Sequence, residues 1–158
     1  MSWEVFYRRG WLRAIGVSNF SELHLQQLME DGATIRPMVN QIEASPYLQW
    51  FNIIKYCQDN NIALQAYSPL GSGLMDVKND ALLLELSAKY QKDVGQVVFR
   101  YLIQKGYAVA YKTTTAKRME SNQDIFDGFE LSTEDMTKID TLNRLDGGWG
   151  LPSPYDLP

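Results

Sequence analysis

Residues 14–20 are Ala-Ile-Gly-Val-Ser-Asn-Phe, a short apolar run that ends in polar residues. Four apolar residues are too few for a helix and are typical of a buried strand. The segment from Ser21 to Asp31 follows, and its leucines have helical spacing. Ser21 is placed to cap this helix, and Gly32 is placed to end it. We therefore expect a strand followed by a helix near the start of the chain.

The same order of segments recurs along the rest of the chain. The strand-like runs are 38–42, 62–67 and 107–111, and the helix-like segments are 48–60, 80–91, 94–105, 115–123 and 132–143. Strands that alternate with helices favour parallel βα units in an α/β fold. About four such units fit two architectures, a small open doubly wound sheet or half of a (β/α)8 TIM barrel.

The ends of the chain have weaker patterns. Residues 3–9 have the character of a short helix that is stopped by Gly10. Ser132 and Asp135 have the spacing of a capping box at the start of the last helix. Glycine and proline are frequent from about residue 147, so we expect residues 1–158 to form a single domain with an irregular C-terminal tail.

Composition excludes several classes of function. The chain has 158 residues, a net charge of −4 and a pI of about 5.0, so general nucleic-acid binding is not expected. Cys57 is the only cysteine and His24 the only histidine, which excludes an internal disulfide and argues against a metal site. No apolar run approaches the roughly 20 residues that span a bilayer. We expect no membrane segment, no secretory signal and a cytoplasmic location.

Polar residues follow each expected strand, where the chain turns. These residues are Ser18 and Asn19, then 40–43, 67–72 and 112–115. In barrel enzymes the active site lies at the carboxyl ends of the strands. One such turn could serve only to cap the next helix. Four of them in register favour a binding site for a small-molecule ligand.

The order and spacing of these motifs, from about residue 10 to 145, resemble those of the aldo-keto reductase family. The matching stretches are Ala14–Phe20, Val39–Glu43 with Pro46 and Tyr47, Ala66–Gly71, Lys112–Thr115 with Arg118 and Asn122, and Phe126–Leu131. The resemblance implies a barrel of eight βα units that binds a nicotinamide dinucleotide, usually NADP. It places this chain in the C-terminal half of that barrel, as strands five to eight.

The resemblance also assigns residues to parts of NADP. They are Ser18, Asn19 and Gln41 for the nicotinamide carboxamide, Tyr67 for the nicotinamide face, Ser68, Leu70 and Ser72 for the pyrophosphate loop, Lys112, Thr113 and Arg118 for the 2′-phosphate, and Asn122 for the adenine. An arginine fork and a lysine point charge suit a phosphate ester.

By the same resemblance, the family's catalytic Asp, Tyr, Lys and His come from its first half, so no catalytic residue is assigned here. Tyr47 is the tyrosine best placed to reach the rim, with no Asp or Lys evident beside it in the sequence. His24 and Cys57 are expected to be structural. The chain departs from the family pattern at Ser45, Leu74, Tyr111 and Ser121, which predicts weak NADP binding.

Three functions remain open on these grounds. The first is an NADP-linked carbonyl reductase, or the cofactor-binding half of one. The second is a repurposed half barrel that catalyses a non-redox isomerisation or cyclisation of a small organic molecule. The third is a non-catalytic binding module or a fragment.

A half barrel would leave two sheet edges open, and open edges favour pairing with another chain. A homodimer is therefore the expected partner arrangement. Alternatively, the chain covers its own sheet with the aromatic and apolar residues Trp3, Phe6, Trp149, Leu151 and Tyr155.

Overall fold

Four parallel strands in chain order form the centre of the molecule. The computed structural model describes residues 2–73, 75–126, 128–144 and 154. The strands are β1 (Gly16–Ser18), β2 (Val39–Glu43), β3 (Ala63–Tyr67) and β4 (Tyr107–Val109), paired in the order β1-β2-β3-β4. A doubly wound sheet would reverse its strand order at a switch point. The unbroken order is that of a TIM barrel, and it rules out the doubly wound alternative.

The helices lie close to the positions expected from the sequence. They are α1 (Trp3–Arg8), α2 (Glu22–Glu30), α3 (Phe51–Asp59), α4 (Ala81–Tyr90), α5 (Val94–Gln104), α6 (Ala116–Gln123) and α7 (Thr133–Asp140). Two short 3-10 turns, η1 (Gly71–Gly73) and η2 (Val77–Asn79), were not expected. The start of α3 at residue 48 was also wrong. Ser45 and Leu48 pair through both backbone N–H groups in a tight turn at 3.1 and 3.0 Å, which delays the helix.

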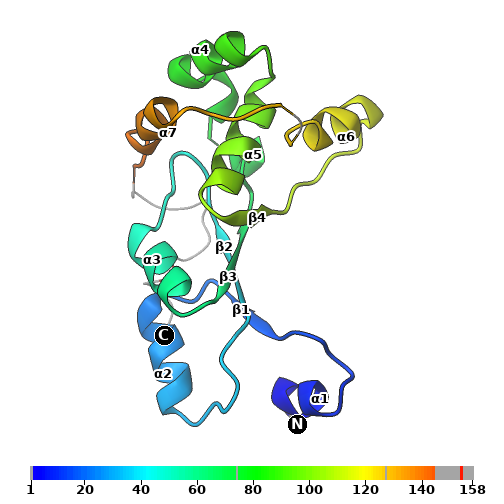
Figure 1. The fold of residues 1–158 in the computed structure, drawn as a ribbon, viewed down its shortest axis with the longest axis vertical. Helices are drawn as coiled ribbons and strands as arrows, with labels where there is room; N and C mark the ends of the chain where they lie inside the picture. Colours follow the sequence, from blue (N-terminus) through cyan, green and yellow to red (C-terminus); the bar gives the residue numbers. More distant parts are fainter. Residues whose placement is uncertain (1, 74, 127, 145–153, 155–158) are drawn as a thin grey trace.

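The two faces of the sheet differ in what covers them. Helices α2, α3 and α5 pack on one face, where Asn40, Ile42 and Ala66 have no exposed surface (Figure 1). The opposite face would line the interior of a complete barrel. Its central row pairs Ser18 with Gln41, Gln41 with Gln65 and Gln65 with Ala108. These four residues are half-buried or exposed, so this face is open and largely polar.

Helix α2 begins as the sequence predicts, with Ser21 as its cap. The Ser21 hydroxyl accepts a hydrogen bond from the His24 backbone N–H, and the His24 ring nitrogen Nδ1 accepts one from the Ser21 N–H, both at 3.3 Å. The single histidine therefore completes a capping box. Gly32 follows the helix with a φ of 99°, in the left-handed region that glycine adopts without strain.

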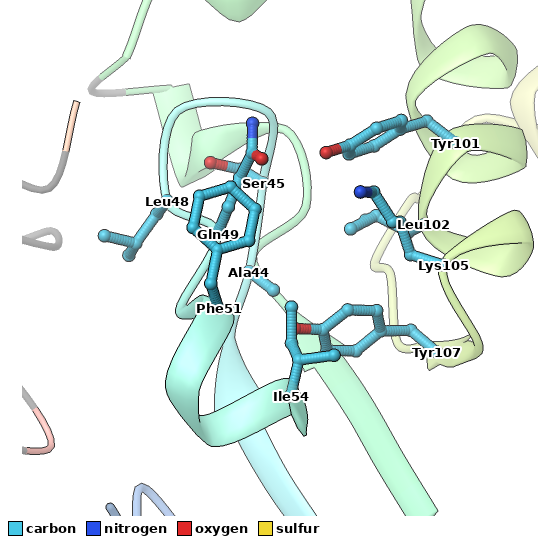
Figure 2. Close-up of a pocket in the computed structure, with 10 residues that line it drawn as sticks. All are labelled: Ala44, Ser45, Leu48, Gln49, Phe51, Ile54, Tyr101, Leu102, Lys105 and Tyr107. Carbon is cyan, nitrogen blue, oxygen red and sulfur yellow. The ribbon is translucent and has the colours of Figure 1, made fainter. Parts of the chain in front are cut away.

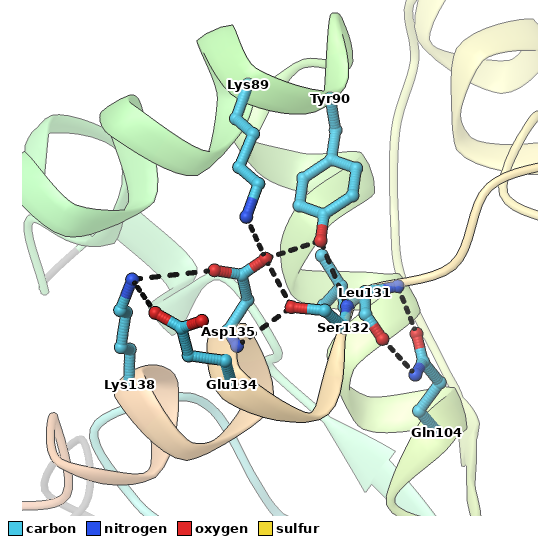
Figure 3. A network of polar contacts seen from close by, with 8 residues as sticks. All are labelled: Lys89, Tyr90, Gln104, Leu131, Ser132, Glu134, Asp135 and Lys138. Carbon is cyan, nitrogen blue, oxygen red and sulfur yellow. Dashed lines mark hydrogen bonds and ion pairs between the residues drawn. The ribbon is translucent and has the colours of Figure 1, made fainter.

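The capping box expected at Ser132 and Asp135 forms only in part. The Ser132 hydroxyl accepts from the Asp135 backbone N–H at 3.2 Å, but the Asp135 carboxylate does not return to the Ser132 N–H. That N–H donates instead to the Tyr90 hydroxyl at 2.9 Å. The fully buried Asp135 carboxylate accepts from Lys89 at 2.7 Å, from Tyr90 and from the Ser132 hydroxyl at 2.8 Å (Figure 3). Asp135 thus ties α7 to α4.

Some sequence-based expectations fall outside the described residues. These are the tail from about residue 147, the covering role of Trp149, Leu151 and Tyr155, and the departure at Leu74. Within the described residues, no helix is long and apolar enough to cross a bilayer. The same residues contain no group of three His, Cys, Asp or Glu side chains that could hold a metal ion.

We predict that Asp135→Asn lowers the free energy of unfolding by about 2–4 kcal/mol at pH 7, because it removes a buried charge from its donors. Burial alone would raise the pKa of Asp135, but the hydrogen bonds from Lys89, Tyr90 and Ser132 outweigh it and hold the pKa at about 2. An unfolded aspartate has a pKa of about 3.9. The carboxylate therefore stabilises the fold above about pH 4, and this contribution is lost as the pH falls towards 2.

Urea unfolding of both proteins between pH 7 and pH 2 measures this difference. The matched control is Asp59→Asn, because Asp59 forms an exposed ion pair with Lys55 at 2.8 Å. Its effect should stay below about 0.5 kcal/mol. Equal losses from the two substitutions, or a gap between wild type and Asp135→Asn that does not narrow in acid, would contradict the assignment.

Candidate functional site

The first turn of the site follows β1. The Ser18 hydroxyl donates to the backbone carbonyl of Gln41 at 3.0 Å, and the Asn19 N–H donates to the same carbonyl at 2.9 Å. Asn19 has a φ of 58°, a conformation that asparagine tolerates better than most residues. Capping does not explain these two side chains, because Ser21 is the cap of α2. Ser18 and Asn19 therefore lie at the end of β1 without a capping role.

Tyr67, the last residue of β3, contacts this turn. Its hydroxyl donates to the Asn19 side-chain oxygen at 3.1 Å. Burial raises the pKa of Tyr67. The Gln41 side-chain amide donates to the Gln65 side-chain oxygen on the same open face. The structure therefore gathers Ser18, Asn19, Gln41 and Tyr67 at one rim of the sheet.

A cleft of about 910 Å³ opens beside this rim, after β3 and β4. Ser68, Leu70, Ser72 and Lys112 line it, as do Asp76, Lys78 and Asn79. The last three were missed by the sequence analysis, which assigned no residue beyond Ser72 in this loop. The sequence gives little indication of these three residues, because η2 does not coincide with any motif identified above. The structure brings them to the cleft by folding the chain back through two short turns.

The loop that forms one wall of the cleft has an unusual backbone. Ser68 and Ser72 have φ values of 51° and 47°, and Gly71 and Gly73 have values of 71° and 84°. Left-handed residues mixed with right-handed ones turn backbone N–H groups toward one side, an arrangement that suits anions. The Ser72 hydroxyl donates to the Ser68 hydroxyl at 2.9 Å. Both hydroxyls therefore lie together on the cleft wall.

The remaining predicted residues follow β4. Lys112 is exposed on the cleft, and Tyr111 before it stacks on Phe99 with ring centroids 5.1 Å apart. The Thr113 hydroxyl accepts from the Thr115 N–H at 3.2 Å. Arg118 and Asn122 lie on α6, which Figure 1 shows to one side of β4, and neither lines the cleft. The structure thus brings Lys112 to the cleft, but not Thr113, Arg118 or Asn122.

Two groups of Tyr, Asp and Lys lie on the helical side of the sheet. In one, the Tyr101 hydroxyl donates to Asp140 at 2.6 Å and the Lys105 ammonium group pairs with Asp140 at 2.8 Å. Burial and the bond to Asp140 raise the pKa of Tyr101. Figure 2 shows Tyr101 of α5 and Lys105, the residue that follows α5, projecting toward α3 around a cavity of only about 10 Å³, room for about one water molecule. The group at Asp135 in Figure 3 is of the same kind. Both groups join helices, and their members bond to one another there.

The surroundings of Tyr47 differ from the expectation that no Asp or Lys lies beside it. Its hydroxyl donates to the Asp80 carboxylate at 2.7 Å, and the Arg144 guanidinium lies 4.0 Å from its ring centre. Burial and the bond to Asp80 raise the pKa of Tyr47 to about 12. Asp80 was missed because it is distant in sequence, and its effect makes Tyr47 a weaker acid.

Comparison with known proteins gives one matching family model. The model described as the aldo/keto reductase family covers residues 2–144. Glyoxal reductase of Bacillus subtilis (strain 168) is 44% identical over 141 residues, which are 89% of this chain and 50% of that protein. Aldose reductase C of Dictyostelium discoideum is 42% identical over 134 residues, 85% of this chain and 41% of that protein.

Solved structures give the same result. An aldo-keto reductase from a Medee basin deep-sea metagenome library superposes with a TM-score of 0.87 at 39% identity, covering 92% of this chain and 54% of that one. A Bombyx mori aldo-keto reductase in complex with NADP superposes with a TM-score of 0.86 at 34% identity, covering 98% of this chain and 52% of that one. The chain therefore spans about half the length of the relatives that it matches.

Proposed function

Because this chain belongs to the aldo/keto reductase family, we propose that it is the NADP-binding, C-terminal half of a reductase barrel. The observation that carries the proposal is the gathering of strand-end side chains at one rim, with Tyr67 bonded to Asn19 and Lys112 on the adjacent cleft. A Bombyx mori relative that superposes on 98% of the chain was crystallised with NADP.

The groups present fit the chemistry of a nicotinamide dinucleotide. Asn19 and Gln41 offer amides that can exchange hydrogen bonds with a carboxamide, and Tyr67 offers an aromatic ring. The cleft of about 910 Å³ lies within the usual range of ligand sites, about 300–1,000 Å³. When bound, the cofactor would supply a hydride. The side chains of this chain would orient the nicotinamide ring and hold the phosphates.

Carbonyl reduction also needs a proton donor at the developing alkoxide. Burial raises the pKa values of Tyr47, Tyr67, Tyr101 and Tyr107, so these four tyrosines are weaker acids than free tyrosine. We therefore propose that this chain binds the cofactor and that the proton donor belongs to a complementary half of the barrel. The described contacts give the non-redox alternative no specific support.

We predict that NADP binds more tightly than NAD and that Lys112→Ala weakens NADP binding by about 1–3 kcal/mol, since it removes a charged contact to the 2′-phosphate. Affinity for NAD should change little. Quenching of tryptophan fluorescence during titration measures both affinities. Lys55→Ala is the control, because it removes the same charge from the outer helix α3. Equal affinity for NAD and NADP in the wild type would refute the assignment.

A second prediction concerns turnover. The chain alone should not reduce aldehydes with NADPH, because a general acid typically contributes about 10²–10⁴-fold to such a step. The loss of NADPH absorbance with a panel of aldehydes is the measurement. Turnover on the order of 1 s⁻¹ would show that a proton donor exists in the chain and would overturn this part of the proposal.

For the chain without that complementary half, we also propose that a second copy pairs with the open edges of the sheet. Within the described residues, β1 and β4 are the outer strands and are three residues long each, so β4 of one copy matches β1 of the other. Two such junctions would close eight strands about a two-fold axis. Beside β1, a cavity of about 420 Å³ is lined by Trp3, Ile15 and Val17, and Trp3 is 70% exposed. This surface is available to the second copy.

Val109→Pro tests this pairing. The Ala110 N–H bonds to Ala66 in β3 at 2.8 Å, so by the alternation of a parallel ladder the Val109 N–H points to the free edge. Proline there removes an outward donor and leaves the bonds to β3. In sedimentation equilibrium we expect a dimer for the wild type and a monomer for the variant. The circular dichroism spectrum of the variant should match that of the wild type. A wild type that stays monomeric at its highest soluble concentration would rule out the pairing.

A further inference from the structure

Most lysines of this chain are neutralised by carboxylates. Ion pairs to described carboxylates hold Lys55, Lys89, Lys92, Lys105 and Lys138. Lys78, Lys112 and Lys117 form none with the described residues. Two of these three, Lys78 and Lys112, line the same cleft. The resemblance to known reductases accounts for Lys112, whereas Lys78 has no assigned role.

Burial and hydrogen bonds fix the backbone before and after Lys78. Val77 is fully buried, and the Asn79 N–H donates to the Asp76 carbonyl at 3.2 Å within η2. Asp80 then caps α4 by accepting from the Leu82 and Leu83 N–H groups at 2.9 and 3.1 Å. The exposed Lys78 side chain therefore projects from a fixed turn on the wall of the cleft.

The two acidic residues nearest in sequence, Asp76 and Asp80, do not form an ion pair with Lys78, and Asp80 accepts from Tyr47 instead. Asp76 is the only carboxylate among the residues that line the cleft, and its side chain accepts from the Asn79 amide at 2.7 Å. Ser68 and Ser72 add two hydroxyls to the lining, on the loop with left-handed residues. The cleft thus offers two hydroxyls and two ammonium groups that form no ion pair with the described residues, and these are donors that suit neighbouring phosphates.

We propose that Lys78 binds the pyrophosphate of the dinucleotide, while Lys112 reads the 2′-phosphate. This assignment rests on the proposed NADP-binding function. The pyrophosphate is common to NADP and NAD, and the 2′-phosphate occurs only in NADP. Lys78 therefore contributes equally to both cofactors, and Lys112 contributes to the difference between them.

The experiment compares Lys78→Met, which keeps the length of the side chain without its charge, with Lys78→Arg, which keeps the charge. We expect Lys78→Met to weaken NADP and NAD binding by the same factor, about three- to tenfold for an exposed charge contact. Lys78→Arg should stay within about twofold of the wild type, since its charge is retained. Lys55→Met is the matched control and should leave both affinities unchanged.

Titration calorimetry with inorganic pyrophosphate separates this inference from the proposed function. If NADP binds and Lys78→Met changes neither affinity, or weakens only NADP, the role of Lys78 is overturned and the proposed function stands. If pyrophosphate binds in a manner that depends on Lys78 but NADP does not bind, the anion site stands and the proposed function is overturned. If the wild type binds neither pyrophosphate nor NADP, both are overturned.

Discussion

The register between the parallel strands is the constraint on which the rest of the site depends. Glu43 pairs with Tyr67, so β2 and β3 end level at one rim, while Ser18 at the end of β1 pairs with Gln41, two residues before that rim. A slip of one residue would turn Gln41 toward the helices and a buried apolar residue toward the open face. This register requires a glycine at position 16. A Cβ at Gly16 would lie only 2.4 Å from the Val39 carbonyl oxygen, so a larger residue would push β1 away from β2.

The charged groups that join helices lie on the other side of the sheet, and Asp135 among them is fully buried. Asp135 joins α7 to α4, and Asp140 joins α7 to α5, through tyrosine and lysine partners in both cases. These contacts hold α4, α5 and α7 together on the helical side of the sheet. They also account for residues that resemble catalytic groups in type, because these tyrosines, aspartates and lysines bond to one another between helices. The rim and the open face therefore carry the groups that remain available to a ligand or to another chain.

The sequence alone predicted the local features of this fold well. Apolar runs located the four strands, and Ser21 was identified as a cap because its partners lie within three residues. Features that depend on distant residues were not predicted. The Tyr47–Asp80 hydrogen bond spans 33 residues, and the Asp135–Tyr90 bond spans 45. Lys78 was missed for the same reason, because only the folded turn η2 brings it to the cleft with Lys112.

We propose that the strand-end rim and the adjacent cleft form one cofactor site. Mapping amide chemical shifts by NMR during titration with NADP tests this most directly, because each residue reports separately. We expect the amides of Asn19, Tyr67, Ser72, Lys78 and Lys112 to shift together with one binding curve, while those of α3 and α7 stay unchanged. Shifts confined to α6, or spread over the helical side without the rim, would contradict it.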